Sequence, residues 1–380
     1  MKRIATPTRI DYIKKLEEIS FEFHTLDGAY WNEAAHYSFS MEEVNTIERA
    51  TNELYAMCLK AVAFIIENKY YATLRIDEKL IPLIERSWCN NEPSIYGRFD
   101  LAYNGIDQPK MLEFNADTPT TLYECAVVQW KWLEEINPKA DQFNSVHEKL
   151  IAYWASCKKY FNKEIVHFCS VDTIEDFTTT EYLRDTAQQA GLNTKYLNIQ
   201  DIGWDENNRV FVDLEEKEIK NIFKLYPWEW MIDEQFGFNI GADENKTRWI
   251  EPAWKSILSN KAILAVLWQL FPYNEYLLPC YFGNEHELRN FVVKPIYSRE
   301  GANVSIFKDG ILETETSGEY GEEGFVYQKL YDFEKFDDYY PIIGSWIIGD
   351  EAAGMGIRES KTKITGNLSL FVPHLIEKTV

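Results

Sequence analysis

The spacing of apolar residues along the chain predicts where helices and strands lie. Between 42 and 71 apolar side chains recur every three or four residues, which predicts one or two amphipathic helices, and 145–161 repeats this pattern. Apolar and polar residues alternate in YGRFDLAY (96–103) and KMLEFNA (110–116), so the polar loop NGIDQP between them predicts a β-hairpin. The helix that follows is expected to end before Asn137, with Thr118 as its N-cap and Pro119 as its first residue.

The middle of the chain has the pattern of an α/β unit. EIVHFCSVD (164–172) and TKYLNI (194–199) are typical of strands, and a helix that stops at Gly191 joins them. Further strands joined by glycine-rich turns are expected at FVVKPI (291–296), VSIF (304–307), FVYQKL (325–330) and SWIIGD (345–350). We interpret 354–356 (GMG) as a β-turn. Because the sequence has no internal repeat or long linker, we expect its domains to interlock.

Composition and charge exclude several classes of protein. The chain has 380 residues, and its 61 acidic against 39 basic residues give a net charge of −22, which argues against a protein that tracks a nucleic-acid backbone. Its 12 Trp, 23 Tyr and 22 Phe argue against disorder. The first residues contain no apolar leader, and the apolar run 262–271 is about half of the ~20 residues that span a bilayer. The six cysteines are scattered, so we expect a cytoplasmic protein with reduced thiols and no membrane segment.

The predicted hairpin gathers charge on one face. Because side chains alternate along a strand, the loop length gives a register that pairs Arg98 with Asn115, Asp100 with Glu113 and Tyr103 with Lys110. The opposite face then carries a core set made of Phe99, Leu101, Tyr103, Leu112 and Phe114. Two opposed carboxylates repel each other, and a hard cation such as Mg²⁺ would offset the repulsion and leave positions for phosphate oxygens. The alternative is a solvated polar face on which Arg98 neutralises both acids.

Other positions are candidates for contact with an anion. The N-terminus of the helix after Thr118 lies beside the charged face, and the N–H groups and dipole of such an end favour an anion. Lys294 leaves an apolar strand toward a loop with Gly301, which indicates either a phosphate contact or a surface lysine at a strand end. That loop lacks the spacing of a P-loop. Taken alone, Lys261 indicates a helix boundary, and Arg358 a surface ion pair with its neighbour Glu359.

Together these segments resemble the glutathionylspermidine synthase-like family of ATP-grasp acid–amine ligases. The resemblance runs from about residue 20 to the C-terminus and is carried by YGRFDLAYNG, MLEFNADTPT, FKLYPWEWM, IEPAWKSILSNKAILAVLWQLFP, FVVKPIYSREGANVSI, FVYQKLY and GMGIRES. It implies an α+β, ATP-grasp fold with a preATP-grasp-like α/β portion, in a stand-alone form without an amidase domain. We expect N-terminal helices, the metal-binding hairpin and the following helix over 1–160, the preATP-grasp-like portion over 161–235, and the nucleotide-binding portion over 236–380.

The resemblance also implies roles for individual residues. Magnesium would be held with the nucleotide by Asp100, Glu113 and Asn115, and Arg98 would stabilise the transferred phosphoryl group as the catalytic residue. ATP would contact Arg98, Lys261, Lys294, Ser298, Arg299, Glu300, Gly301, Ala302, Gln328, Lys329 and Leu330. The substrate would contact Thr118, Thr120, Glu175, Asp176 and Arg358. Leu225 and Trp230 stand where glutathionylspermidine synthases carry hydroxyl residues, so we expect a different substrate preference.

The function implied is that of a carbon–nitrogen ligase. A small-molecule or short-peptide carboxylate would attack the γ-phosphate of ATP to give an acyl-phosphate, and an amine would then displace phosphate to form an amide. Phosphoryl transfer needs charge neutralisation and alignment rather than a covalent nucleophile. Two alternatives stay open: an ATP-dependent phosphotransferase that uses the same site, and a non-catalytic nucleotide-binding protein on the same fold. The sequence does not indicate an oligomeric state.

Overall fold

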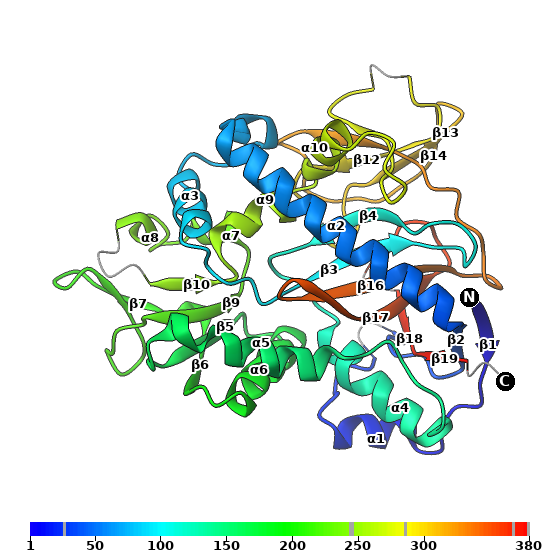
Figure 1. Ribbon diagram of the computed structural model, residues 1–380, viewed down its shortest axis with the longest axis horizontal. Coiled ribbons are helices and arrows are strands. Elements are labelled where there is room, and N and C mark those ends of the chain that lie inside the picture. Colours follow the sequence, from blue (N-terminus) through cyan, green and yellow to red (C-terminus); the bar gives the residue numbers. More distant parts are fainter. Residues whose placement is uncertain (26–27, 243–246, 285–286, 367–368, 378–380) are drawn as a thin grey trace.

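The computed structural model describes residues 1–25, 28–242, 247–284, 287–366 and 369–377, and the fold is α+β. Within these residues the strands form three larger sheets, a three-stranded sheet and a two-stranded ribbon. The three-stranded sheet contains the first and the last described strands, β1 (Lys2–Ala5) and β19 (His374–Ile376), with β2 (Ala35–Phe39) between them, and Figure 1 shows these strands close together.

The central sheet unites distant parts of the sequence. It is antiparallel, with the strand order β18 (Leu370–Val372), β17 (Glu351–Ser360), β16 (Tyr340–Ile348), β3 (Tyr96–Ala102) and β4 (Lys110–Asn115). The β3–β4 hairpin is therefore extended by strands from the C-terminal part of the chain. One long helix, α2 (Met41–Glu67), fills the predicted 42–71 pattern and runs diagonally over this sheet in Figure 1. It begins with a capping box formed by Ser40 and Glu43.

The hairpin has the predicted register over the half that carries the charged face. Arg98 lies opposite Asn115, and Asp100 lies opposite Glu113, so these four side chains share one face. A β-bulge then shifts the pairing between Asp100 and the next residue of β3.

Beyond the bulge the predicted register is wrong. Lys110 faces Ala102 instead of the expected Tyr103, because β4 contributes one extra residue at this point. The predicted core position of Leu112 is wrong for the same reason. Met111 turns into the core in its place, and Leu112 is left half-buried in the wall of a cavity.

A parallel sheet forms the α/β unit. Its strand order is β10 (Arg248–Ile250), β9 (Asn221–Leu225), β5 (Val166–Ser170) and β6 (Thr194–Asn198), and helices α5 (Val146–Phe161) and α6 (Ile174–Gln189) pack beside it. The strands and helices predicted between 145 and 199 are confirmed, including the stop at Gly191, whose φ is 82°. The fourth strand, β10, comes from beyond residue 235.

The third large sheet carries the strands predicted at 291–296, 304–307 and 325–330, whereas the strand predicted at 345–350 forms the end of β16 in the central sheet. The order of the third sheet is β11 (Cys280–Tyr281), β15 (Phe325–Lys329), β12 (Phe291–Pro295), β13 (Ser305–Lys308) and β14 (Ile311–Glu315), and α10 (Ile263–Leu270) packs against β11 and β15. The predicted turn at 354–356 is wrong, since these residues lie inside β17. An added Cβ at Gly354 would come within 3.0 Å of the Phe143 carbonyl, and one at Gly356 within 2.6 Å of the Phe371 ring, so close packing requires both glycines.

The helix after the hairpin begins later than predicted. Thr118 is not its N-cap, because residues 118–121 form a loop and helical structure runs from 122, through η2 (Glu124–Val128, a π-helical turn) and α4 (Gln129–Ile136). Thr121 is the residue whose carbonyl accepts the first helical hydrogen bond, from Cys125 N–H at 3.2 Å. The predicted end before Asn137 is confirmed.

Shorter elements complete the described structure. They are α1 (Tyr12–Glu18), η1 (Tyr70–Leu74), α3 (Ile81–Cys89), η3 (Ile199–Asp201), β7 (Gly203–Asp205), β8 (Val210–Val212), α7 (Trp228–Met231), α8 (Asn239–Ala242), η4 (Ala253–Lys255) and α9 (Ser256–Ser259). None of the helices in the described part of the chain has the length and apolar character needed to cross a membrane.

Candidate active site

A cavity of about 570 Å³ is lined by residues from all three larger sheets. It brings together almost every residue predicted for the site, although these residues are spread between 98 and 358 in the sequence. Ala302 is the exception and lies outside the cavity lining. Leu225 and Trp230, the two departures from the family pattern, are also in the wall.

Arg98 is buried, and its guanidinium is held from two sides. Nε and Nη2 donate to the carboxylate of Asp100 at 2.8 and 3.3 Å, while Nη1 donates to the Thr120 carbonyl at 2.7 Å and to the Thr121 hydroxyl at 3.1 Å. Thr121 has a φ of 69°, which is rare for a β-branched residue, and this strained loop directs both acceptors at the guanidinium. An arginine has five N–H donors. The one left on Nη2 has no acceptor among the described residues.

The opposed carboxylates of the hairpin are neutralised by cations of the protein itself. Asp100 contacts Arg98 and also Arg358. Glu113 lies 3.3 Å from Nζ of Lys261. Burial alone would raise the pKa of Glu113, but the ammonium groups of Lys261 and Lys294 hold it well below its usual range. The repulsion that predicted a metal ion is therefore offset without one.

Arg358 does not form the surface ion pair with Glu359 that its position in the sequence indicated. Successive residues of β17 point to opposite faces of the sheet, so Arg358 reaches Asp100 while Glu359 lies on the other side. There Glu359 accepts hydrogen bonds from Arg3 and from the Tyr37 hydroxyl, all at 2.8 Å.

Asp100, Glu113 and Asn115 still fit a magnesium ion. Carboxylate and amide oxygens are the hard ligands that Mg²⁺ prefers, and the low pKa keeps Glu113 ionised. The Asn115 amide donates to Oε1 of Glu113 at 3.1 Å, which leaves its carbonyl oxygen to act as an acceptor. An ionised carboxylate can accept several contacts at once, so the protein cations do not exhaust these groups.

Lys294 is buried and Lys261 is nearly buried, and hydrogen bonds hold both side chains in place. Lys261 donates to the Ser298 carbonyl at 2.8 Å. Lys294 donates to the Leu112 carbonyl at 2.8 Å and to Gln328 Oε1 at 2.7 Å, and burial lowers its pKa to about 8. Lys294 is therefore not the surface lysine that its sequence position allowed, whereas Lys261 does lie just before a helix, α10. Gln328 in turn donates to the carbonyl of β4 residue 111 at 3.1 Å, which fixes its amide orientation.

The glycine-containing loop 298–301 closes one side of the cavity. Arg299 donates to the Thr118 hydroxyl, in the loop that follows the hairpin, at 2.7 Å and to Glu229 on α7 at 2.6 Å. Its guanidinium also lies over the Trp230 ring, 5.1 Å from the centroid. The Trp230 ring thus helps to hold Arg299, a residue of the loop 298–301, in place. Gly301, with a φ of 68°, makes the turn that brings the loop against the backbone of residue 365.

The predicted substrate residues form a second part of the cavity wall. Glu175 and Asp176 lie in the first turn of α6, as expected, and Thr173 caps that helix. Burial raises the pKa of both carboxyls, and their mutual repulsion adds to the effect on Glu175. This part of the wall is therefore acidic, and the two arginines that act on it, Arg98 and Arg299, already form ion pairs with Asp100 and Glu229.

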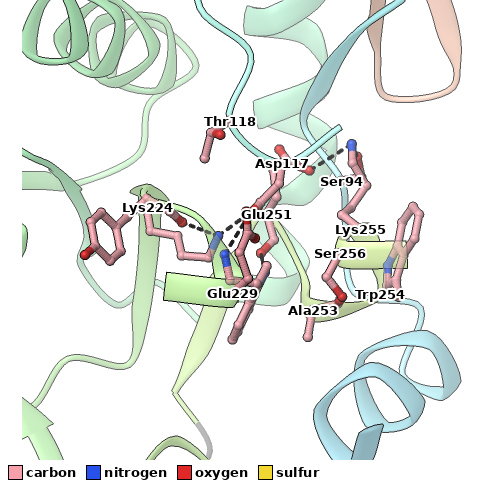
Figure 2. Close-up of polar contacts among 12 residues, drawn as sticks. Ser94, Asp117, Thr118, Lys224, Glu229, Glu251, Ala253, Trp254, Lys255 and Ser256 are labelled. Atoms are coloured by element: carbon pink, nitrogen blue, oxygen red, sulfur yellow. Dashed lines mark hydrogen bonds and ion pairs between the residues drawn. The ribbon is translucent and has the colours of Figure 1, made fainter. Parts of the chain in front are cut away.

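Two buried ion pairs, Lys224–Asp117 and Lys255–Glu251, hold the ends of the hairpin in place, and both are drawn in Figure 2. Lys224 on β9 donates to Asp117 at 2.8 Å, and Asp117 also accepts the Trp228 backbone N–H at 3.1 Å. The Lys224 side chain is 0% and that of Asp117 1% exposed. Because Asp117 follows Asn115 by two residues, this pair fixes the end of the hairpin against the parallel sheet.

A second buried pair fixes the beginning of the hairpin. Lys255 lies 3.3 Å from Glu251 and donates to the Ser94 hydroxyl at 2.6 Å. Glu251 accepts the backbone N–H groups of Ile95 and Tyr96 at 2.9 and 3.2 Å. Sequence reasoning missed both braces. A signal was present for Lys224 alone, since it is the one charged residue within the apolar strand NIFKL (221–225).

Comparisons with known proteins identify relatives of the whole chain. The family model described as glutathionylspermidine synthase preATP-grasp matches residues 3–377. A Haemophilus influenzae protein named as a candidate acid–amine ligase is 44% identical, covering 98% of this chain and 99% of that protein. A trypanothione synthetase from Crithidia fasciculata is 33% identical, covering 83% of this chain and 52% of that protein. The bifunctional glutathionylspermidine synthetase/amidase of Escherichia coli is 28% identical, covering 90% of this chain and 59% of that enzyme.

Proposed function

The chain belongs to the glutathionylspermidine synthase preATP-grasp family, and on that premise we propose that it is an ATP- and magnesium-dependent acid–amine ligase with an ATP-grasp fold. It joins a carboxylate to an amine through an acyl-phosphate. The nucleotide-binding portion is proposed to begin near residue 236, after the hairpin portion (to about 160) and the α/β portion.

The observation that carries the proposal is the convergence of phosphate-binding and metal-binding chemistry in one cavity. Arg98, Lys261 and Lys294 line it together with the oxygen ligands Asp100 and Glu113. Cations held by buried hydrogen bonds are oriented before a ligand arrives, so little reorganisation is needed when charge develops on a phosphoryl group.

The first step is attack by a substrate carboxylate oxygen on the γ-phosphorus of ATP, with ADP as the leaving group. The free N–H of Arg98 would bind the transferred group, while Lys261 and Lys294 would bind phosphate oxygens. When bound by Asp100, Glu113 and Asn115, magnesium would neutralise phosphate charge. In the second step an amine attacks the acyl carbon, and phosphate leaves. No side chain needs to form a covalent bond.

The substrates are proposed to be a small or short-peptide carboxylate and a cationic amine. Arg358 and the hydroxyls of Thr118 and Thr120 are candidates for the acid, and Glu175 and Asp176 for the amine. The adenine is proposed to lie against Gln328, Lys329 and Leu330, with Ser298, Arg299, Glu300 and Gly301 over the phosphates. Glutathione with spermidine is expected to be a poor pair, because Leu225 and Trp230 offer no hydroxyl to pair with a substrate group.

The test uses hydroxylamine to trap the acyl-phosphate. The purified protein is incubated with Mg-ATP and a panel of amino acids, dipeptides and glutathione, and both ADP release and hydroxamate formation are measured. Acid-dependent hydroxamate identifies a ligase. A phosphorylated product without hydroxamate would identify the phosphotransferase, and no ADP release with any acid would favour the non-catalytic alternative.

Two variants and a matched control connect this activity to the cavity. Lys294→Met removes a buried ammonium and is expected to abolish hydroxamate formation. Arg98→Lys keeps the positive charge but loses the planar set of N–H donors of the guanidinium. It should lower turnover by about 10²–10³-fold, the range for one lost transition-state donor. Lys60→Met removes an exposed lysine of α2 and should have no effect. If all three variants were equally active, the cavity would not be the site of the reaction.

A further inference from the structure

A buried carboxyl lies behind the cavity wall without a complete set of partners. Glu124 is 0% exposed in the π-helical turn η2. Its Oε1 accepts a hydrogen bond from the Tyr30 hydroxyl, whereas its Oε2 has no hydrogen-bond partner in the described part of the chain. An unsatisfied buried polar atom destabilises a fold by about 1–3 kcal/mol. Such an atom needs an explanation, and π-helical turns are frequent at functional sites.

Tyr30 connects this carboxyl to the cavity. Tyr30 is one of the residues that line the cavity, and its hydroxyl donates a hydrogen bond to Glu124. The charges that act on the phenol come from Glu124, Glu175 and Arg358. Tyr30 therefore lies near Glu175 and Arg358, two of the predicted substrate residues, and its phenol also interacts electrostatically with Arg98.

The surroundings set the charge state of this pair. Burial raises the pKa of Glu124 to about 7, and the negative charge of Glu175 on α6 adds to this, while the Tyr30 hydroxyl and Arg98 oppose it. On its own helix Glu124 is flanked by Tyr123 and Cys125. The pKa of Tyr30 lies well above its usual value because of burial, so Tyr30 keeps its proton. A carboxyl that titrates near neutral pH can accept a proton and release it again in each cycle.

We propose that Tyr30 and Glu124 form the proton-accepting pair for the amine substrate, with Tyr30 as the catalytic contact and Glu124 as the positioning residue that stores the proton. This rests on the ligase function proposed above. An aliphatic amine arrives as an ammonium ion and has no lone pair for attack. Its first proton passes to Oη of Tyr30 as the phenolic proton passes to Oε1 of Glu124. The freed lone pair forms the C–N bond, the C–O bond to phosphate breaks, and the departing phosphate takes the second proton.

The experiment compares two nucleophiles on the same acyl-phosphate. Hydroxylamine is neutral near neutral pH and needs no prior deprotonation, whereas ammonia, ethylamine, putrescine and spermidine are cations. Glu124→Gln can still accept the Tyr30 hydrogen bond but cannot take its proton. We expect amide formation to fall by about a hundred-fold or more, while hydroxamate formation stays within about three-fold of the wild type. The rise of kcat/KM for the amine through about pH 7 should disappear, and Tyr30→Phe should show the same selectivity.

Tyr37→Phe is the matched control, because Tyr37 also donates to a buried glutamate, Glu359, but does not line the cavity. It should change both nucleophile rates by the same factor. Parallel losses with both nucleophiles in Glu124→Gln, or an unchanged amide rate, would overturn the proton-acceptor role. So would a wild type that makes hydroxamate but no amide from any of the four amines. Absence of wild-type hydroxamate would instead contradict the ligase function itself.

Discussion

The charge state of Glu124 can be tested without any substrate. Its pKa lies at about 7 in the folded protein against an ordinary value of 4.5. A raised folded-state pKa contributes stability that is fully present below about pH 4.5 and is lost as pH rises through about 7. Glu124→Gln carries no such dependence. At about 1.4 kcal/mol per pH unit, the variant should therefore gain about 2 kcal/mol over the wild type between about pH 5.5 and 8.5.

The assay is urea unfolding followed by tryptophan fluorescence, with EDTA present, at several pH values above the sequence pI of 4.8 to avoid precipitation. Contributions of all other groups cancel when the variant is compared with the wild type at each pH. Glu85→Gln is the control with a flat difference, because the hydrogen bond from Lys69 lowers the pKa of Glu85 and the residue stays ionised throughout. A flat difference for Glu124→Gln, or one that shrinks as pH rises, would refute the buried-carboxyl assignment.

Three further outcomes are expected. Glu113→Gln combined with Asn115→Ala should abolish magnesium-dependent turnover while circular dichroism shows a folded protein; retained magnesium-dependent ADP release would contradict the metal assignment. For the free enzyme, kcat/KM for ATP should fall as pH rises through about 8, where Lys294 loses its proton, and Lys294→Arg should move this limb to higher pH if it retains activity; a wild-type profile flat to about pH 9 would contradict the phosphate role. Lys224→Met should cost about 3–5 kcal/mol in the free energy of unfolding by leaving Asp117 as an unpaired buried charge, and adding Asp117→Asn should recover most of it; additive losses in urea titrations would argue against the brace.

Local patterns predicted most of the elements but not their irregularities. The helix over 41–67 and the strands of the α/β unit follow directly from apolar spacing and caps. The start of the helix after the hairpin could not be predicted in this way. The Thr118 and Thr121 hydroxyls accept hydrogen bonds from Arg299 and Arg98, so neither hydroxyl caps the helix. The bulge in β4 could not be predicted from the sequence either, since the extra residue is defined by the pairing of two strands and not by either strand alone.

The partners of the predicted site residues could not be found in the sequence for a related reason. Asp100 and Glu113 were identified from the hairpin, yet their counter-ions Arg358 and Lys261 come from elements far along the chain. Only the sheet that places β17 and β16 beside β3 brings Arg358 within reach. The pair of Tyr30 and Glu124 could not be predicted for the same reason, because only the fold brings these two residues, distant in the sequence, into contact.

The electrostatics of the cavity could not be inferred from the net charge of −22. On the hairpin face, Arg98, Arg358, Lys261 and Lys294 outnumber the two carboxylates that they contact or surround, which leaves a local excess of positive charge. The nucleotide phosphates proposed above would offset that excess, even with a divalent ion bound. At α6 the balance is reversed, since Glu175 and Asp176 repel each other, and a cation beside them would offset this repulsion. A cavity divided in this way can hold an activated acid on its cationic side and an ammonium on its acidic side. The ammonium must then lose a proton before it can attack, which is the step that Tyr30 and Glu124 are placed to perform.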